Sequence, residues 1–299
     1  MSDWLISLEG TPAGHNLALG LALAAAVLHA VFGALQKGRH DPWLTRGATD
    51  IVYATIMLPV ALFLVPWPEP FLWAILAGAW VIHMIYKLLQ AQAYSKGDYT
   101  VVYPVVRGTG PLVTIMAAGY VFNEVYEPMQ WLGVALLTAG IFGLAAYNLS
   151  HANTDRARLK LAITLAFFTG IMTAAYTTFD AYGIRAAADP FTFLAWFFVV
   201  DGIAFPIIAT RLYRKMSDPP KLPPLMLRGF FGGIIALLSF GAIMMATRLD
   251  KVGEAAVLRE TSTLFAALIG WLFLKETVGP KRAALMGLIA FGAVLVEFG

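Results

Sequence analysis

The stretch VVRGTGPLV, residues 105–113, has a counterpart 152 positions later in VLRETSTLF, residues 257–265, where Arg107 matches Arg259 without a gap. Working outward over residues 98–143, the same offset pairs Asp98 with Asp250, Val105 with Val257, Leu112 with Leu264, Glu124 with Glu276, Pro128 with Pro280, Leu136 with Leu288 and Gly140 with Gly292. Apolar matches carry little weight in so apolar a chain, but the aligned arginine, glutamate, proline and glycine do. They indicate an internal duplication.

The composition indicates a membrane protein. The 299-residue chain is 59% hydrophobic and 13% charged, with a mean hydropathy of +0.72, whereas soluble domains have about 25% charged residues. Apolar runs of about 20 residues recur along the chain, as a bilayer requires of its helices. A transmembrane β-barrel would need alternating segments of about ten residues, so we predict an all-α integral membrane protein.

Ten continuous apolar segments predict ten transmembrane helices. They cover residues 16–36, 45–65, 70–94, 100–122, 129–148, 159–183, 190–212, 225–247, 252–274 and 281–298. We therefore expect two five-helix repeats, residues 1–152 and 153–299, forming one membrane domain with a central pathway. Because five is odd, the second repeat enters the membrane inverted, a plan common in secondary transporters.

Basic residues predict the orientation. The loops after the odd-numbered segments hold Lys37, Arg39, Arg46, Lys96, Arg156, Arg158, Lys160, Arg211, Arg214, Lys215, Lys221, Arg228, Lys275, Lys281 and Arg282. The opposite loops and the termini hold only Arg185, Arg248 and Lys251. The positive-inside rule places the first set in the cytoplasm and both termini outside. Asp3 and Glu9, with no basic residue before the first segment, predict no cleavable signal peptide.

Polar residues lie in stripes inside these segments, and intramembrane ionisable residues are functional candidates by default. His83, Lys87, Gln90 and Tyr94 follow intervals of four, three and four, which puts them on one helix face. The remaining candidates for lining the pathway are Tyr103, Arg107, Tyr176, Asp201, Arg259 and Glu260. Stripes of this kind must turn away from lipid, and together they predict a wet central pathway.

The residue types suggest what the pathway binds. Arg107 and Arg259 are permanently charged forks suited to a carboxylate, and their equivalent places allow them to approach each other near a pseudo-twofold axis. Glu260 or Asp201 would face an ammonium group, and tyrosines would supply flat apolar walls. This set suits a zwitterion with an apolar side chain. The alternative is that Arg107 pairs with one of these acids and simply holds helices together.

The two copies differ in their backbone. Pro104 and Pro111, with glycines between them, predict a kink or interruption in the first copy. The matching residues 256–263 of the second copy contain neither proline nor glycine, and Thr261 and the pair Ser262–Thr263 stand there instead. Interrupted helices mark binding sites in transporters. We therefore expect the interruption in the first copy only.

Two further charged pairs have structural interpretations. Glu124 and Glu276, repeated at helix ends, are expected to fix the helix that follows each of them. Arg46 and Asp50, spaced i and i+4, are expected to form an ion pair at the mouth of the pathway.

The repeats also resemble a known family. Gly119-Tyr-Val-Phe-Asn-Glu124 and Gly270-Trp-Leu-Phe-Leu-Lys-Glu276 are each followed, four residues after the glutamate, by a proline and then by a glycine-bearing helix. This resembles the EamA family of the drug/metabolite transporter superfamily over nearly the whole chain. The resemblance implies a bacterial-type inner-membrane exporter of small metabolites that works by alternating access, most like the exporters of aromatic and neutral amino acids.

Other functions find less support in the sequence. The chain has no cysteine, no Gly-Lys-Ser/Thr phosphate loop, no rhomboid-like Gly-x-Ser-Gly and no His-Glu-x-x-His motif, so we expect no cofactor, no metal and no enzymatic activity. Mixed charges on two inverted halves argue against an ion channel, which usually presents rings of like charge. Export of another metabolite or drug, uniport and a channel-like protein remain the alternatives. Neither nucleic acid nor an obligatory protein partner is implied.

Overall fold

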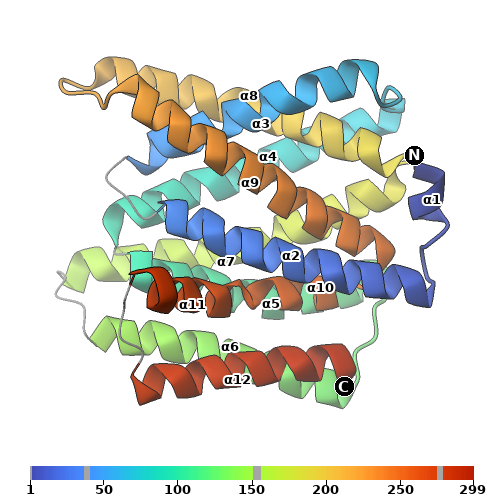
Figure 1. The fold of residues 1–299 in the computed structure, drawn as a ribbon, viewed down its shortest axis with the longest axis vertical. Coiled ribbons are helices and arrows are strands. Elements are labelled where there is room, and N and C mark those ends of the chain that lie inside the picture. Colours follow the sequence, from blue (N-terminus) through green and yellow to red (C-terminus); the bar gives the residue numbers. More distant parts are fainter. Residues whose placement is uncertain (1, 37–40, 98, 151–155, 275–278) are drawn as a thin grey trace.

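The fold was analysed in a computed structural model, which describes the chain except residues 1, 37–40, 98, 151–155 and 275–278 (Figure 1). The described residues form helices and connecting turns without strands. The helices are α1 (Ser2–Ile6), α2 (Pro12–Gln36), α3 (Pro42–Phe63), α4 (Pro70–Lys96), α5 (Tyr99–Phe122), α6 (Pro128–Ser150), α7 (Arg156–Ala186), α8 (Pro190–Lys215), α9 (Leu222–Leu249), α10 (Val252–Glu260), α11 (Ser262–Leu274) and α12 (Pro280–Phe298).

The predicted all-helical membrane fold is confirmed, but a count of ten membrane-spanning helices is not. Eight helices in the described part of the chain, α2 to α9, are long and apolar enough to cross a bilayer. The predicted ninth segment is divided at Thr261 into α10 and α11. The predicted tenth corresponds to α12, which carries Lys281, Arg282 and Glu297 within 19 residues. Bulky apolar side chains such as Phe63 and Phe168 are exposed on the outer surface, as contact with lipid requires.

The helices pack as a symmetric arrangement of two halves. An offset of 152 residues relates α2 to α7, α3 to α8, α4 to α9, α5 to α10 and α11, and α6 to α12. Equivalent helices contact each other in the pairs α3–α8 and α6–α12, which lie at opposite sides of the bundle (Figure 1). Helix α2 packs against α9, and its counterpart α7 packs against α4, the counterpart of α9. In the same way α7 packs against α5, and α2 packs against α10 and α11. Each of these contacts thus has the counterpart that a pseudo-twofold axis would generate.

The related helices α2 and α7 run in opposite directions. His15, in the first turn of α2, contacts the side chain of Asp250 at the end of α9. Arg185, in the last turn of α7, donates a hydrogen bond to the backbone oxygen of the same aspartate over 2.6 Å. The start of one helix and the end of its counterpart therefore lie at the same end of the bundle, where both chain termini also lie (Figure 1).

Glycines allow α6 and α12 to touch along their backbones. A Cβ atom added to Gly292 would lie 2.6 Å from the carbonyl oxygen of Gly133, and one added to Gly140 would lie 3.0 Å from the carbonyl oxygen of Leu285. Leu285 and Gly292 are the counterparts of Gly133 and Gly140 at the same offset, so the two contacts are related by the pseudosymmetry. Small residues at helix interfaces are the usual means of close packing in a bilayer.

The repeated glutamate of the first copy fixes a helix, but not the one that follows it. The Glu124 carboxylate accepts hydrogen bonds from the backbone N–H groups of Val252 and Gly253, at 2.8 and 3.2 Å, and so caps the start of α10 in the other repeat. The Tyr126 hydroxyl also donates to this carboxylate. Burial and that hydrogen bond hold the pKa of Tyr126 well above its usual range, so the tyrosine remains a neutral donor at any physiological pH. The matching Glu276 lies outside the described residues.

Candidate functional site

A buried charge network surrounds Lys87, near the middle of α4. Its Nζ atom donates hydrogen bonds to Asp50 Oδ2 on α3 at 2.5 Å, and to Asp201 Oδ2 on α8 at 2.8 Å. It also lies 3.1 Å from the Tyr53 hydroxyl, which itself donates to Asp201 Oδ2 over 2.5 Å. All four side chains are buried. A buried charge is stable only when it is paired and hydrogen-bonded. These bonds satisfy the lysine and join α4 to α3 of the first repeat and to α8 of the second.

Arg46 and Asp50 form the predicted ion pair, but the pair belongs to this network and not to the mouth of the pathway. The Nε of Arg46 lies 2.8 Å from Oδ1 of Asp50. Asp50 has no exposed surface and also binds Lys87. The spacing in the sequence predicted the pair, whereas its depth depends on how α3 packs against α4 and α8.

His83, one turn before Lys87 on α4, extends this network toward α7. Its Nε2 lies 2.7 Å from Asp180 Oδ2, and its Nδ1 lies 3.9 Å from Asp201 Oδ1. The rings of Tyr176 and Phe197 pack against the imidazole, with centroids 4.5 and 4.9 Å away. Histidine and aspartate thus form a buried pair enclosed by aromatic rings.

A second buried cluster joins α5 to α10 and α11. The Nε of Arg107 lies 2.8 Å from Glu260 Oε2, and its Nη2 donates to Ser262 Oγ over 3.0 Å. The Tyr103 ring lies under this guanidinium, 5.8 Å from its central carbon to the ring centroid. Arg259 approaches the same glutamate from the other side, with Nη2 3.8 Å from Glu260 Oε1. The two repeated arginines therefore meet at one carboxylate.

The helix interruption coincides with this cluster. At Thr261 the backbone N–H bonds to the carbonyl of Leu258, three residues back, and the helix resumes at Ser262. The Thr261 hydroxyl donates to the Leu258 oxygen over 2.6 Å, and the Thr263 hydroxyl donates to the Glu260 oxygen over 2.8 Å. By contrast, α5 is continuous through Pro104 and Pro111. The prediction that only the first copy is interrupted is therefore wrong: the interruption lies in the second copy, at Thr261.

A small cavity lies between the two networks and is lined by one basic and one acidic side chain. Arg259 and Asp180 both line it, together with Tyr176, Thr177, Phe240, Ile243, Met244 and Thr247. Among the described residues, Arg259 Nε and Asp180 Oδ1 are buried polar atoms without a hydrogen-bond partner. The Arg259 Nη2 atom donates only a long bond, 3.4 Å, to Thr177 Oγ1. Unsatisfied buried polar atoms are uncommon and call for an explanation.

The cavities beside the two networks are too small for a metabolite in this structure. The cavity at Arg259 and Asp180 has a volume of about 10 Å³, as does a second one lined by His29, Arg46, His83 and Asp201. That is room for about one water molecule each, whereas small-molecule sites occupy about 300–1,000 Å³. An apolar groove of about 350 Å³ between α3, α8 and α9 contains none of the predicted pathway residues. A substrate would therefore enter only after the bundle opens.

Most of the predicted pathway residues come together in these two networks. His83, Lys87, Tyr176 and Asp201 lie in the first, and Tyr103, Arg107, Arg259 and Glu260 in the second. Gln90 is half-buried and donates to the Tyr86 hydroxyl over 2.6 Å. Tyr94 is half-buried and packs against an apolar cluster that includes Val102 and Val105. These two extend the stripe of α4 away from the charges.

The sequence prediction omitted Asp50 and Tyr53 from the pathway. Asp180 lies one helical turn after Tyr176, on a polar stripe of α7 that also carries Thr169 and Thr173; the sequence places it on this stripe, although it was not among the candidate pathway residues. Asp50 and Tyr53 are spaced i and i+3 inside an apolar segment, which also places them on one face. No three His, Cys, Asp or Glu side chains among the described pathway residues converge within metal-binding distance.

Comparisons with known proteins identify the fold and the family. The chain matches the EamA-like transporter family twice, over residues 16–146 and 160–298. A curated relative, the uncharacterized protein y4nH of Sinorhizobium fredii (strain NBRC 101917 / NGR234), is 38% identical over 68 residues, 23% of this chain. The match spans 58% of that relative's length. A crystal structure of a protein sharing 14% of its residues has the same fold, with a TM-score of 0.73 over 93% of this chain and 95% of the other.

Proposed function

The chain belongs to the EamA-like transporter family, whose members are membrane transporters of small metabolites, and from that premise we propose that it carries zwitterionic amino acids with apolar or aromatic side chains. The substrate carboxylate would bind at Arg259 and the ammonium group at Asp180. Tyr176, Phe240 and Met244 would surround the side chain. The transport is secondary, and export is the direction that we propose.

One observation carries this proposal: opposite charges with unused hydrogen-bonding capacity line the same cavity. Arg259 Nε and Asp180 Oδ1 lack partners among the described residues, and the rest of the cavity lining is mostly aromatic or apolar. A carboxylate can accept from guanidinium N–H groups in a fixed geometry. An ammonium group needs acceptors, and a carboxylate oxygen supplies one.

The charges of the two networks favour the same substrate. Arg107 and Arg259 face one acid, Glu260, which leaves a charge of +1. In the other network the two bases Arg46 and Lys87 face three acids, Asp50, Asp180 and Asp201, which leaves −1 when His83 is neutral. A zwitterion with its carboxylate toward the arginines and its ammonium group toward Asp180 neutralises both. A simple anion or a simple cation would neutralise only one of them.

Alternating access would move the two inverted repeats, residues 1–152 and 153–299, against each other. The Arg107–Glu260 pair and the break at Thr261 lie where the repeats meet, next to the proposed site. Opening there would enlarge the cavity. We further propose a bacterial-type inner membrane with both termini outside, on the charge asymmetry of the loops. A C-terminal alkaline phosphatase fusion should be active, and activity only from a cytoplasmic reporter would overturn this orientation.

The experiment that tests the substrate is competition in proteoliposomes. Uptake of labelled L-phenylalanine would be competed by unlabelled L-phenylalanine, by phenethylamine, which lacks the carboxylate, and by 3-phenylpropionate, which lacks the ammonium group. Only the zwitterion should compete well in the wild type. Arg259→Gln should weaken L-phenylalanine more than phenethylamine, and Asp180→Asn should weaken it more than 3-phenylpropionate. Losing one charged hydrogen bond costs about 1.5–3 kcal/mol, so each effect should be about tenfold or more.

Arg211→Gln is the matched control, because Arg211 is exposed near the end of α8 and away from both networks. It should transport like the wild type. Equal competition by all three compounds, or unchanged preference in both site variants while the protein still folds, would overturn the proposed site. The same vesicles with and without an imposed pH gradient separate proton-coupled transport from uniport.

A further inference from the structure

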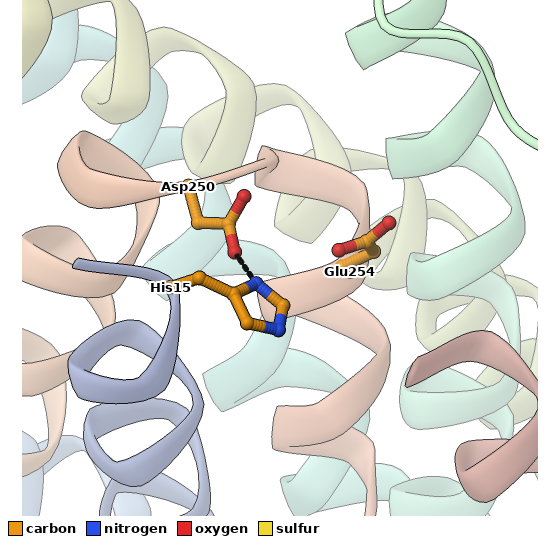
Figure 2. Close-up of side chains that lie close together, drawn as sticks. All are labelled: His15, Asp250 and Glu254. Atoms are coloured by element: carbon orange, nitrogen blue, oxygen red, sulfur yellow. Dashed lines mark hydrogen bonds and ion pairs between the residues drawn. The ribbon is translucent and has the colours of Figure 1, made fainter. Parts of the chain in front are cut away.

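A second group of polar side chains lies outside the pathway, at the end of the bundle that holds both termini. His15 of α2, Asp250 at the end of α9 and Glu254 of α10 each offer a ligand atom, and these atoms lie within 4.8 Å of one another. Figure 2 shows the His15 ring hydrogen-bonded through Nδ1 to Asp250, with the Glu254 carboxylate beyond it. We propose that this group binds a divalent transition metal ion, with Zn²⁺ as the best match, through His15 Nδ1 and the carboxylates of Asp250 and Glu254.

A fourth side chain provides independent support. Glu297, near the end of α12, has a carboxylate side chain that is 4% exposed, and its Oε1 accepts no hydrogen bond among the described residues. That oxygen lies 3.3 Å from Nε2 of His15, the ring nitrogen that would not bind the metal. Histidines that bind metals usually donate their other ring N–H to a carboxylate, which fixes the tautomer and the ring orientation. Glu297 stands where such a partner is required.

The local charge also favours a cation. Three carboxylates, those of Asp250, Glu254 and Glu297, are gathered around His15. Two bases lie beside them: Lys251, with its Nζ 2.8 Å from Glu254 Oε1, and Arg185, with its Nη2 2.6 Å from the Asp250 backbone oxygen. Three acids and two bases leave a charge of −1 when His15 is in the neutral form that binds a metal, so the group attracts a cation.

The ligand types select the class of metal. One imidazole nitrogen with two carboxylate oxygens suits Zn²⁺ and its neighbours in the first transition row, whereas Ca²⁺ and Mg²⁺ prefer oxygen ligands alone. The His15 side chain is 44% exposed and that of Asp250 is 24% exposed, so the ion can reach the site and keep water as a further ligand. The bound ion would replace the hydrogen bond between His15 Nδ1 and Asp250. It would also join α2 of the first repeat to α9 and α10 of the second.

The test is titration of the untagged, detergent-purified protein with ZnCl₂ by isothermal calorimetry, after treatment with a chelator. We expect one Zn²⁺ per chain at pH 7.5, with release of protons, and loss of binding near pH 5.5, where a histidine is protonated. His15→Ala and Asp250→Asn should each abolish binding. Glu297→Gln should weaken it by about 10–100-fold, as expected for a residue that orients a ligand.

Two matched variants make the test specific. His29→Ala removes a histidine from the same helix but not from the group, and should bind Zn²⁺ like the wild type. Lys251→Gln removes the positive charge beside Glu254, and should bind Zn²⁺ more tightly. Folding of each variant is checked by size-exclusion chromatography and circular dichroism. The proposal is overturned if the wild type binds no zinc, if binding survives both His15→Ala and Asp250→Asn, or if Lys251→Gln weakens it.

Discussion

The two copies of the repeated helix, α5 and α10–α11, behave in the opposite way to what their sequences suggest. The copy with Pro104 and Pro111 is one continuous helix, and the copy without proline or glycine at the matching places is interrupted at Thr261. Threonine hydroxyls bind carbonyl groups in both copies, but in different ways. Those of Thr109 and Thr114 in α5 bind the carbonyl four residues back, whereas those of Thr261 and Thr263 bind the carbonyl three residues back, at the interruption.

The interruption also depends on the first copy. Arg107 Nη2 lies 3.0 Å from Ser262 Oγ and 3.5 Å from the Arg259 carbonyl oxygen, so the α5 arginine contacts the chain on both sides of the break. Arg259 has no equivalent contact with a break in α5. The duplicated arginines have therefore diverged: Arg107 holds the broken helix of the other repeat, and Arg259 keeps part of its guanidinium free beside the cavity.

The largest expected effect tests this divergence directly. Arg107→Ala leaves Glu260 buried with only Arg259 at 3.8 Å, and breaking a buried ion pair costs about 3–5 kcal/mol. We expect a large fall in thermal stability in detergent and loss of transport. Arg259→Ala should also abolish transport, but thermal stability should fall much less, because the contacts of Arg259 with Glu260 and Thr177 are longer than those of Arg107 with Glu260 and Ser262. Equal destabilisation by the two substitutions would contradict the division of roles. Arg107→Met combined with Glu260→Met should recover stability but not transport.

The next effect concerns the capping of α10. Glu124→Ala removes a carboxylate that accepts from Val252 and Gly253, and a hydrogen bond to a charged group contributes about 1.5–3 kcal/mol. We expect the protein to unfold at a lower concentration of SDS, and transport to decline with it. If the repeats are functionally symmetric, Glu276→Ala has a similar effect. An unchanged unfolding midpoint for Glu124→Ala would show that the cap is dispensable.

A smaller effect is expected at the break itself. Thr263→Val keeps the shape of the side chain but removes the hydroxyl that binds the Glu260 carbonyl oxygen, which should cost about 1 kcal/mol. Melting temperature and uptake rate would be measured together, with Thr114→Val in α5 as the matched control, because the Thr114 hydroxyl binds a carbonyl of an unbroken helix. If the break takes part in opening, Thr263→Val changes the uptake rate and Thr114→Val does not.

The smallest effect is expected at Pro111, one of the two prolines that predicted an interruption in the first copy. Pro111→Ala restores a backbone N–H in a helix that is already continuous, while the more flexible unfolded chain offsets this gain by about 0.4–1 kcal/mol. We expect nearly unchanged stability and uptake at a rate close to that of the wild type. Loss of transport in a stable Pro111→Ala protein would show that α5, rather than α10–α11, contains the moving break.

The sequence was sufficient for the features that repeat or recur with a helical period. The offset between Arg107 and Arg259 predicted that both would reach one place, and the spacing of His83 and Lys87 predicted a shared face. The partners were not predictable, because which helix faces which depends on packing between residues far apart in the chain. Asp180 pairs with His83 across 97 residues, and Lys87 with Asp201 across 114. The break at Thr261 was missed because the sequence argument considered only proline and glycine as residues that interrupt a helix.

The contacts between equivalent helices have a consequence for how the chain is assembled. In the pairs α3–α8 and α6–α12, the same surface is used on both sides, as in the self-complementary interface of a twofold dimer. The helices of these pairs lie entirely within residues 1–150 or 156–299. Residues 1–150 and 156–299, produced together as separate chains, should therefore associate into one functional unit. In this sense the protein is an antiparallel dimer of related subunits joined end to end, and its two halves are free to change independently wherever they do not touch.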